Sequence, residues 1–231
     1  MKSLLLLNGS PRCERSNSMK MLVRVAEGWQ QGGGQAPDVI HLAQHAHFDR
    51  AVAAFAQADV VLLGMPLYTD AMPAIVMAYI EALAPRLAAA QAGGANPSLA
   101  FLVQSGFPEA LHSRPLERYF EKLARRLNSP YAGTIVRGGG ESLQMIPEEA
   151  NKKLWARLRT LGMQLARDDR FSPAELKAVA GTERFSAFSA VLLSVAAKLP
   201  IVQFYWNSQL KKNGTWERRF AAPYGPAYRR L

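Results

Sequence analysis

Short apolar runs alternate with longer amphipathic segments through the first 170 residues. The runs are Leu4 to Leu7, Val39 to Leu42, Asp59 to Met65, Leu99 to Val103 and Tyr131 to Val136. Between them, apolar residues recur every three or four positions, as in helices with one buried face. Five short buried strands that alternate with helices predict a doubly wound α/β domain with a parallel sheet.

One predicted helix, from Pro73 to about Ala84, is apolar on almost every side. Glu81 is its only charged residue before Ala84. A helix on the surface of a single subunit would normally show a polar face. We therefore expect this helix to be buried, and an interface between subunits is one place that would bury it.

The pattern changes after residue 170. A capping box at Ser172 to Glu175 begins a short helix. The stretch from Phe185 to Trp206 then carries one charge, Lys198, and is divided by Pro200 into two short helices, so it is not a clean membrane span. Basic residues follow it, namely Lys211, Lys212, Arg218, Arg219, Arg229 and Arg230.

These features predict two parts, a domain over residues 1–170 and a helical, basic extension over residues 171–231. The interpretation that we favour is an extension that packs on the domain or on a second subunit. The alternative is an interfacial membrane anchor with a basic flank, which would make the chain a peripheral membrane protein.

The loop after the first strand has the composition of an anion site. It reads NGSPRCERSNS and ends where a helix begins, at a point where unpartnered N–H groups and the helix dipole favour negative charge. Ser10, Ser16, Asn17 and Ser18 add short polar side chains, and Arg12 adds a guanidinium suited to phosphate. One of these residues is expected to cap the helix, but together they exceed what a cap requires. The loop therefore predicts a phosphate site.

Two missing motifs narrow the choice of phosphate ligand. Gly9 stands alone, so the dinucleotide fingerprint GxGxxG is absent, and so is the nucleotide loop GxxxxGK[ST]. The mononucleotide site of flavodoxin-like folds remains, in which FMN binds where the strand order reverses. The predicted order is 2-1-3-4-5, and it brings the loops after strands one, three and four to one edge of the sheet.

Two of these loops resemble a known family. Asn8 to Arg12, followed by Ser16 to Ser18, resembles the phosphate loop of the NAD(P)H-dependent FMN reductases and quinone reductases. The spacing P-x-Y-x-x-x-x-P in Pro66 to Pro73 resembles the loop that holds the flavin ring in the same family. The resemblance covers roughly Lys2 to Arg167 and is specific in these two loops only.

The resemblance implies an FMN-dependent NAD(P)H oxidoreductase with a flavodoxin-like fold. Hydride would pass from NADH or NADPH to the flavin, and then to a quinone-like or other small acceptor. The flavin carries this chemistry, so no catalytic side chain is required and none is named. The implied FMN contacts are Ser10, Arg12, Ser16, Asn17 and Ser18 at the phosphate, Pro66, Leu67, Tyr68 and Thr69 at the ring, and Ser105, Gly106 and Phe107 at its far edge.

Members of this family are often homodimers with flavin sites at the interface, so the resemblance implies a homodimer. Many members carry a lysine near the position of Met77 and an Asp-Arg pair near Glu81 and Ala82. This chain departs from that pattern at these positions.

The composition of the chain limits the classes of partner and of flavoprotein that fit it. The chain has 231 residues, 49% of them apolar, and a formal charge of +10, which leaves nucleic acid, an anionic membrane and anionic small molecules as partners. No nucleic-acid motif is visible, so we expect no nucleic-acid partner. The charge also argues against an acidic flavodoxin-type electron carrier.

The cysteine content and the N-terminus indicate where the protein works. Cys13 is the only cysteine, which excludes an internal disulfide and fits a reducing compartment. Met1 to Ser3 leads directly into the first strand, and four leucines are too few for a signal peptide. These features predict a cytoplasmic protein, associated with a membrane only if the extension is an anchor.

Other functions stay open from the residues alone. A metal site could be formed by three histidines, His41, His45 and His47. They lie in a connecting segment with no cysteine nearby, so we expect no metal site there. The main alternative to the reductase is a flavodoxin-fold flavin-binding electron-transfer or interaction protein without NAD(P)H turnover. A third is an interaction module with an empty site.

Overall fold

The computed structural model describes residues 1–91, 96–196 and 200–222. Contacts divide the chain into two units, Met1–Arg184 and Phe185–Leu231. The sequence predicted the boundary between the domain and the extension after residue 170. The helix α8 (Pro173–Ala180), which follows that boundary, packs on the strand β5 and the helix α7 of the first unit. Lys198, Arg229 and Arg230 of the predicted basic extension lie outside the described residues.

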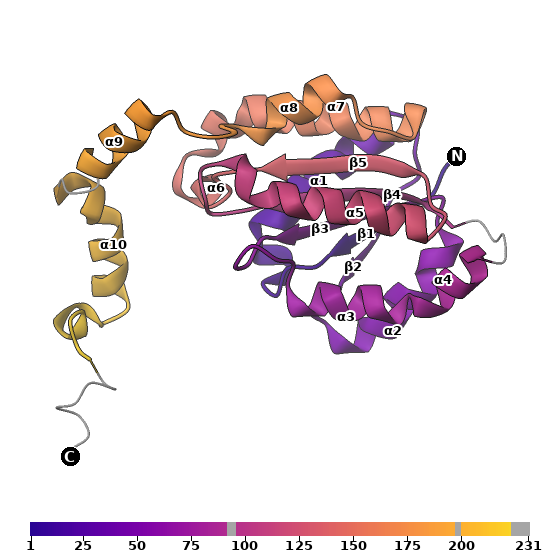
Figure 1. Cartoon of the computed structure of the whole chain (residues 1–231), viewed down its shortest axis with the longest axis horizontal. Coiled ribbons are helices and arrows are strands. Elements are labelled where there is room, and N and C mark those ends of the chain that lie inside the picture. Colours follow the sequence, from indigo (N-terminus) through magenta and orange to yellow (C-terminus); the bar gives the residue numbers. More distant parts are fainter. Residues whose placement is uncertain (92–95, 197–199, 223–231) are drawn as a thin grey trace, which may run out of the picture. The chain divides into compact units, whose positions relative to one another are not determined.

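The first unit is built on a five-stranded parallel sheet with the order β2-β1-β3-β4-β5, as predicted (Figure 1). Its strands are β1 (Leu4–Asn8), β2 (Asp38–His41), β3 (Val60–Pro66), β4 (Ser98–Gln104) and β5 (Tyr131–Arg137). Every residue of β1, β3 and β4 is buried. The apolar runs are unbroken because both faces of these strands are covered by helices.

Helices cover both faces of this sheet (Figure 1). Alternate residues of β1 point to opposite sides, so Leu4 and Leu6 enter one core cluster while Leu5 and Leu7 enter the other. The first cluster is covered mainly by α1 (Asn17–Gln31), α7 (Lys152–Asp168) and α8, with α6 (Ser142–Met145) at its margin. The second lies under α2 (His45–Ala54), α3 (Ala74–Ala82), α4 (Ala84–Gln91) and α5 (Arg114–Arg126).

The helices α1 and α7 approach each other through glycines. A Cβ atom added to Gly28 would lie 1.9 Å from the carbonyl oxygen of Arg159 in α7. A Cβ atom added to Gly162 would lie 2.0 Å from the carbonyl oxygen of Val25 in α1. The two helix backbones are therefore close enough that only glycine fits at either position.

The helix α3 corrects one expectation. It begins after Pro73, as the sequence predicts, but only Val76 and Tyr79 are buried, and Met77 is 48% exposed. Within the single chain, one face of α3 packs on the core and the other meets solvent. The apolar pattern could not reveal this, because small apolar residues such as Ala74 and Ala78 occupy the exposed face.

The second unit holds α9 (Ala187–Ala196) and α10 (Pro200–Lys212), followed by a 3-10 helix at Trp216–Arg218. The predicted division at Pro200 falls beside residues 197–199, which lie outside the described residues, so it stays a prediction. Within the described parts of the chain, no helix is both long enough and apolar enough to cross a bilayer.

Candidate functional site

The three polar loops meet at the carboxyl edge of the sheet, where the strand order reverses between β1 and β3. They enclose a cavity of about 90 Å³. Of the predicted flavin contacts, Ser18, Thr69, Ser105 and Phe107 do not line this cavity. The lining residues are Ser10, Arg12, Ser16, Asn17, Pro66, Leu67, Tyr68, Gln104, Gly106 and Glu141.

Two of the predicted phosphate donors are already engaged within the protein. Ser16 caps α1, since its Oγ accepts the N–H of Met19 at 3.0 Å and donates to the carbonyl of Cys13 at 2.7 Å. Ser18 is fully buried, and its Oγ lies 3.4 Å from Nε2 of Gln104. The hydroxyl hydrogen of Ser16 is therefore already donated, and Ser18 does not line the cavity, so both side chains shape the loop.

The remaining side chains of the loop keep donor groups for an anion. Ser10 accepts the N–H of Arg12 at 3.3 Å, which leaves its hydroxyl hydrogen to donate. Asn17 accepts from Nε2 of Gln144 at 2.8 Å through its Oδ1, which leaves its NH₂ group to donate. Arg12 is exposed and, among the described residues, has no acidic partner. These groups surround the start of α1, whose first N–H groups have no partner within the helix.

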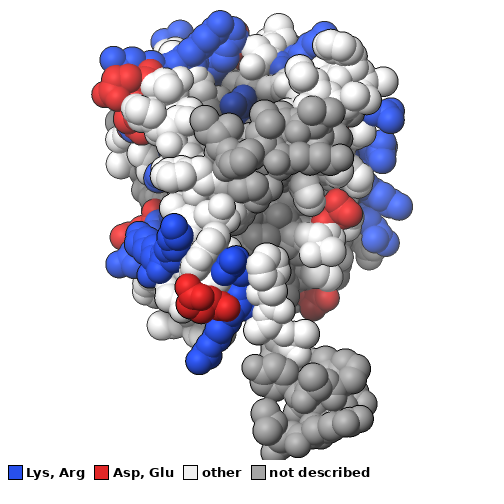
Figure 2. Space-filling model, turned by 90° about the vertical axis from the view of Figure 1, so that its left-hand side faces the viewer, with Lys and Arg blue, Asp and Glu red and all other residues white. Residues whose placement is uncertain are grey.

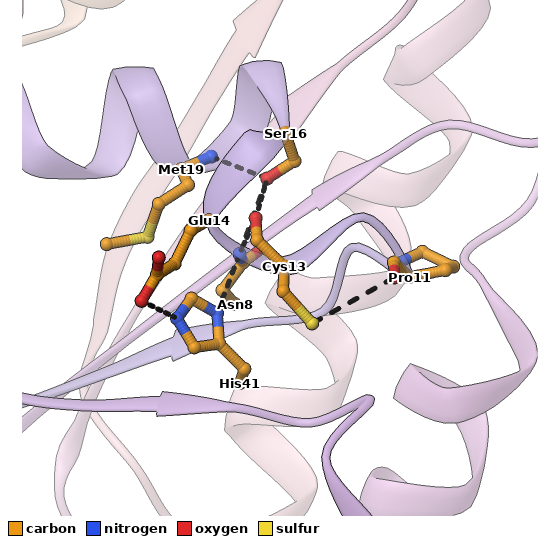
Figure 3. A network of polar contacts seen from close by, with 7 residues as sticks. All are labelled: Asn8, Pro11, Cys13, Glu14, Ser16, Met19 and His41. Atoms are coloured by element: carbon orange, nitrogen blue, oxygen red, sulfur yellow. Dashed lines mark hydrogen bonds and ion pairs between the residues drawn. The ribbon is translucent and has the colours of Figure 1, made fainter.

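A buried asparagine holds the phosphate loop in place (Figure 3). The Nδ2 of Asn8 donates to the Cys13 carbonyl at 2.8 Å, and it lies 3.1 Å from Nδ1 of His41. Its Oδ1 accepts the N–H of Ser10 at 3.0 Å. His41, at the end of β2, also faces the carboxylate of Glu14 at 4.0 Å. Asn8 thus joins two points of the loop to the neighbouring strand.

Sequence reasoning did not assign this role to Asn8 or His41. A signal was present, because Asn8 is the polar residue that ends an otherwise apolar buried strand. A buried amide at that place needs partners for all of its polar atoms, and the adjacent loop supplies them. His41 ends the neighbouring strand β2, but its contact with Asn8 depends on the register between β1 and β2.

The predicted ring loop after β3 is a tight hairpin. Tyr68 and Ala71 exchange two backbone hydrogen bonds, of 2.9 and 3.0 Å, across Thr69 and Asp70. Both central residues have positive φ, 47° and 62°, as in the turns that connect paired strands. The N–H of Leu67 donates to the carbonyl of Gln104 at 2.8 Å, which fixes the base of the loop. The half-exposed ring of Tyr68 is thereby held at the mouth of the cavity.

The loop after β4 is closed by the glycine-rich segment after β5. Gly139 and Gly140 donate their N–H groups to the carbonyls of Phe107 and Ser105, each at 2.6 Å. A Cβ atom on Gly140 would lie 2.0 Å from Oε1 of Gln104. The Ser105 hydroxyl also bonds to the Phe107 carbonyl at 3.2 Å, so the predicted contact Ser105 supports the loop. Phe107 is half-exposed and packs on His112, with ring centroids 4.5 Å apart.

Gln104 and Glu141 line the cavity but were not predicted as contacts. Gln104 is the buried last residue of β4, so its position at the carboxyl edge could have been inferred from the apolar run before it. Glu141 arrives from the segment after β5, and only the folded structure shows that it faces the same cavity. It adds an acidic group to a cavity that is also lined by the cationic side chain of Arg12.

The predicted histidine segment is distributed over two elements. His41 ends β2, whereas His45 and His47 lie in the first turn of α2. The described residues contain no group of three or more His, Cys, Asp or Glu side chains placed to hold a metal ion.

Comparison with known proteins identifies the family. A family model described as a flavodoxin-like fold matches residues 2–158, which is more than half of the chain. The chain therefore belongs to the flavodoxin-like family. A search of curated proteins found no match.

Several solved structures share this fold. An NADH:FMN oxidoreductase in its apo form is 16% identical, with a TM-score of 0.56, over 76% of this chain and 94% of its own. An NADPH-quinone reductase from P. pentosaceus is 18% identical, with a TM-score of 0.52, over 72% of this chain and 98% of its own.

An FMN-dependent NADH-azoreductase from Bacillus anthracis, solved in complex with FMN, is 13% identical, with a TM-score of 0.54. It matches 72% of this chain and 100% of its own. At identities this low, these likenesses establish the fold alone.

Proposed function

We propose that the protein is an FMN-dependent NAD(P)H oxidoreductase that reduces a quinone-like or other small acceptor. The observation that carries this proposal is the cavity at the switch point, where free phosphate donors face a rigid aromatic loop. The names of the structures with the same fold, an NADH:FMN oxidoreductase and an NADPH-quinone reductase, support the same class.

The chain offers a suitable cradle for the phosphate of FMN. Ser10 and Asn17 retain donors at the start of α1, and the guanidinium of Arg12 would supply a charge-assisted bond. Ser16 and Ser18 would act indirectly by fixing the loop. Bound FMN would supply the hydride-accepting ring, and the chain would supply its binding and orientation.

The ring would lie outside the enclosed part of the site. A cavity of about 90 Å³ is much smaller than the roughly 300–1,000 Å³ of typical ligand pockets, so it takes only part of a mononucleotide. Leu67 is buried at the base, while the half-exposed rings of Tyr68 and Phe107 present apolar surface beside the opening. This open side would give both the nicotinamide and the acceptor access to the flavin.

We further propose that two copies form a homodimer through the exposed face of α3. Ala74, Met77 and Ala78 share that face and carry no charge. Since α3 follows directly after the ring loop, a second copy placed there would lie next to the open side of the cavity. It would cover the part of the flavin that one chain leaves exposed.

Absorption spectroscopy tests the proposed activity. The purified protein should bind FMN, and its flavin spectrum should bleach when NADPH or NADH is added without oxygen. Bound flavin that neither cofactor bleaches would favour the electron-transfer alternative. A protein that binds no FMN would contradict the proposal.

The variant Arg12→Ala tests the phosphate loop. Loss of a charge-assisted bond to the phosphate should weaken FMN binding roughly 10- to 100-fold, measured by fluorescence titration. Arg15→Ala is the matched control, because Arg15 is an exposed arginine of the same loop that does not line the cavity. Equal affinities of the two variants would show that Arg12 does not hold the phosphate.

A further inference from the structure

The second unit carries its large apolar side chains on the outside. In α9, Phe188, Val191 and Leu192 are 79%, 64% and 59% exposed, and their spacing places them on one face of the helix. In α10, Phe204 and Trp206 are 72% and 63% exposed. None of the buried hydrophobic clusters among the described residues includes a residue of this unit.

Basic residues lie in the last turn of α10, at Lys211 and Lys212, and directly after it, at Arg218 and Arg219. Residues 185–231 hold seven Lys and Arg against one Glu, which gives +6 of the chain's formal charge of +10 in a fifth of its length. Within the described chain, none of Lys211, Lys212, Arg218 and Arg219 pairs with an acidic side chain. On the face of the protein drawn in Figure 2, Lys and Arg (blue) cover more of the surface than Asp and Glu (red).

Aromatic rings stand among these cations. Nζ of Lys211 lies 5.1 Å from the ring centroid of Trp216, and Cζ of Arg219 lies 4.0 Å from the same ring. Cζ of Arg219 is also 4.8 Å from the ring centroid of Phe220. Rings that are flanked by cations and close to an apolar helix suit the boundary between hydrocarbon and headgroups.

The charge of the extension indicates which kind of surface could cover the exposed apolar side chains of α9 and α10. The first unit, residues 1–184, has a formal charge of +4, since the extension holds +6 of the total of +10. Docking the extension on that unit, or on a second copy, would bring like charges together. A nucleic acid would neutralise the cations but leave the apolar helices in water. An anionic bilayer matches both the basic and the apolar residues.

We propose that α9, α10 with its terminal Lys211 and Lys212, and residues 213–220 form a docking surface for an anionic phospholipid bilayer. The apolar side chains would enter the boundary between headgroups and acyl chains, and the cations would contact phosphate groups. The helices would lie along the membrane surface, and none of the described helices is both long enough and apolar enough to span it. This inference is independent of flavin binding and of turnover.

Cosedimentation of the full chain with vesicles tests the proposal. At low salt, the protein should pellet with vesicles that contain about 30% phosphatidylglycerol in phosphatidylcholine, and much less with pure phosphatidylcholine. Binding should decrease when the salt is raised to about 0.5 M, because the electrostatic part is screened. Failure to bind anionic vesicles at low salt would overturn the proposal.

Two charge variants test where binding occurs. The quadruple variant Lys211→Gln, Lys212→Gln, Arg218→Gln and Arg219→Gln should lose at least about tenfold in vesicle affinity. The matched control changes four exposed cations of the first unit, as Arg125→Gln, Arg126→Gln, Lys152→Gln and Lys153→Gln. Both variants lose four positive charges, so an equal loss of binding would show that total charge is responsible and the extension is not.

A third variant and a fluorescence measurement test insertion. Phe188→Ser with Leu192→Ser changes only exposed side chains, so it should fold normally and bind vesicles at least about tenfold more weakly. Trp29 and Trp155 are buried, so a blue shift of tryptophan emission on vesicle binding would report Trp206 and Trp216. Unchanged tryptophan emission would contradict the proposal. The proposal would also be contradicted if the protein self-associated in a way that removed vesicle binding, or if it bound RNA in preference to vesicles.

Discussion

Asn8 makes contacts with the loop and with a neighbouring strand through one short side chain. Its amide accepts from Ser10, donates to Cys13 and lies against His41, while the residue itself is fully buried. Each of these contacts satisfies a polar atom that water cannot reach easily. The conformation of the phosphate loop therefore depends on a residue that does not line the cavity.

Replacing this side chain should affect both stability and binding. Asn8→Ala leaves the Ser10 N–H without its acceptor and should lower the free energy of unfolding by about 1–3 kcal/mol. FMN binding should weaken as well, because the loop loses its anchor. Chemical denaturation and fluorescence titration measure the two effects.

Asn8→Asp separates the two functions of the amide. It keeps an acceptor for Ser10 but puts a carboxylate against the carbonyl of Cys13, so it should be at least as damaging as Asn8→Ala. If Asn8→Asp behaved like the wild type, the donated hydrogen bond would have no importance for the loop.

At the level of elements, the close contact between α1 and α7 supports the helix whose start lines the proposed anion site. The N-terminal end of α1 faces the cavity, and its C-terminal half is held against α7 through Gly28 of α1 and Gly162 of α7. Because the atoms that oppose these glycines are backbone atoms, neither helix can yield by moving a side chain. The start of α1 at the cavity is thus supported by a backbone contact in the C-terminal half of the same helix.

Gly162→Ala should separate these two helices. The added methyl group meets the carbonyl of Val25, and overpacking of this kind lowers the free energy of unfolding by about 1–3 kcal/mol. Thermal denaturation would show a lower melting temperature. Gly106→Ala is the control for stability, since its nearest neighbour, Cβ of Glu141, is 3.9 Å away; an equal loss in both variants would contradict the close approach.

The elements were the most predictable level of this structure. Strands covered on both faces leave unbroken apolar runs such as Leu4 to Leu7, and their alternation with helices defined the sheet order. The sequence predicted a buried α3 but did not show how much of it its own chain covers, because an apolar run does not distinguish a core from an interface between subunits. Only one of its faces packs on the core.

For the candidate site, the sequence predicted which loops come together, but it predicted few of the hydrogen bonds that those loops make. The sequence located Ser16 and Ser18 in the phosphate loop, but their engagement by Cys13 and Gln104 depends on folded geometry. Glu141 is far from the other lining residues in sequence and reaches the cavity only through the turn after β5. Donor types can be inferred from composition, whereas their partners require the tertiary structure.

Two carboxylates, near the start and the end of the first unit, have pKa values below their ordinary range. Hydrogen bonds from the N–H and hydroxyl of Ser3 hold the pKa of Asp59 below its ordinary value, and thereby tie the start of the chain to β3. The guanidinium of Arg114 in α5 similarly lowers the pKa of Glu183, at the end of the unit.

These two groups predict acid sensitivity. A carboxyl whose pKa is lower in the folded state stabilises the fold above its unfolded pKa, and this contribution is lost as the pH falls through the folded value. Stability should therefore decrease below about pH 4.5, the ordinary value for a glutamate. Asp59→Asn with Glu183→Gln should be less stable at neutral pH and should depend less on pH in the acid range, as measured by denaturation at each pH. An unchanged acid profile would contradict this assignment.

The small size of the cavity has a kinetic consequence. Under the proposed function, one chain encloses little beyond the phosphate end of FMN, so the flavin should exchange rapidly and dialysis should remove it. A second copy beside the ring loop would slow this exchange. The residence time of FMN should then increase with protein concentration. In a dilute preparation the flavin would bind and leave like a substrate, whereas in a concentrated preparation it would stay bound as a cofactor.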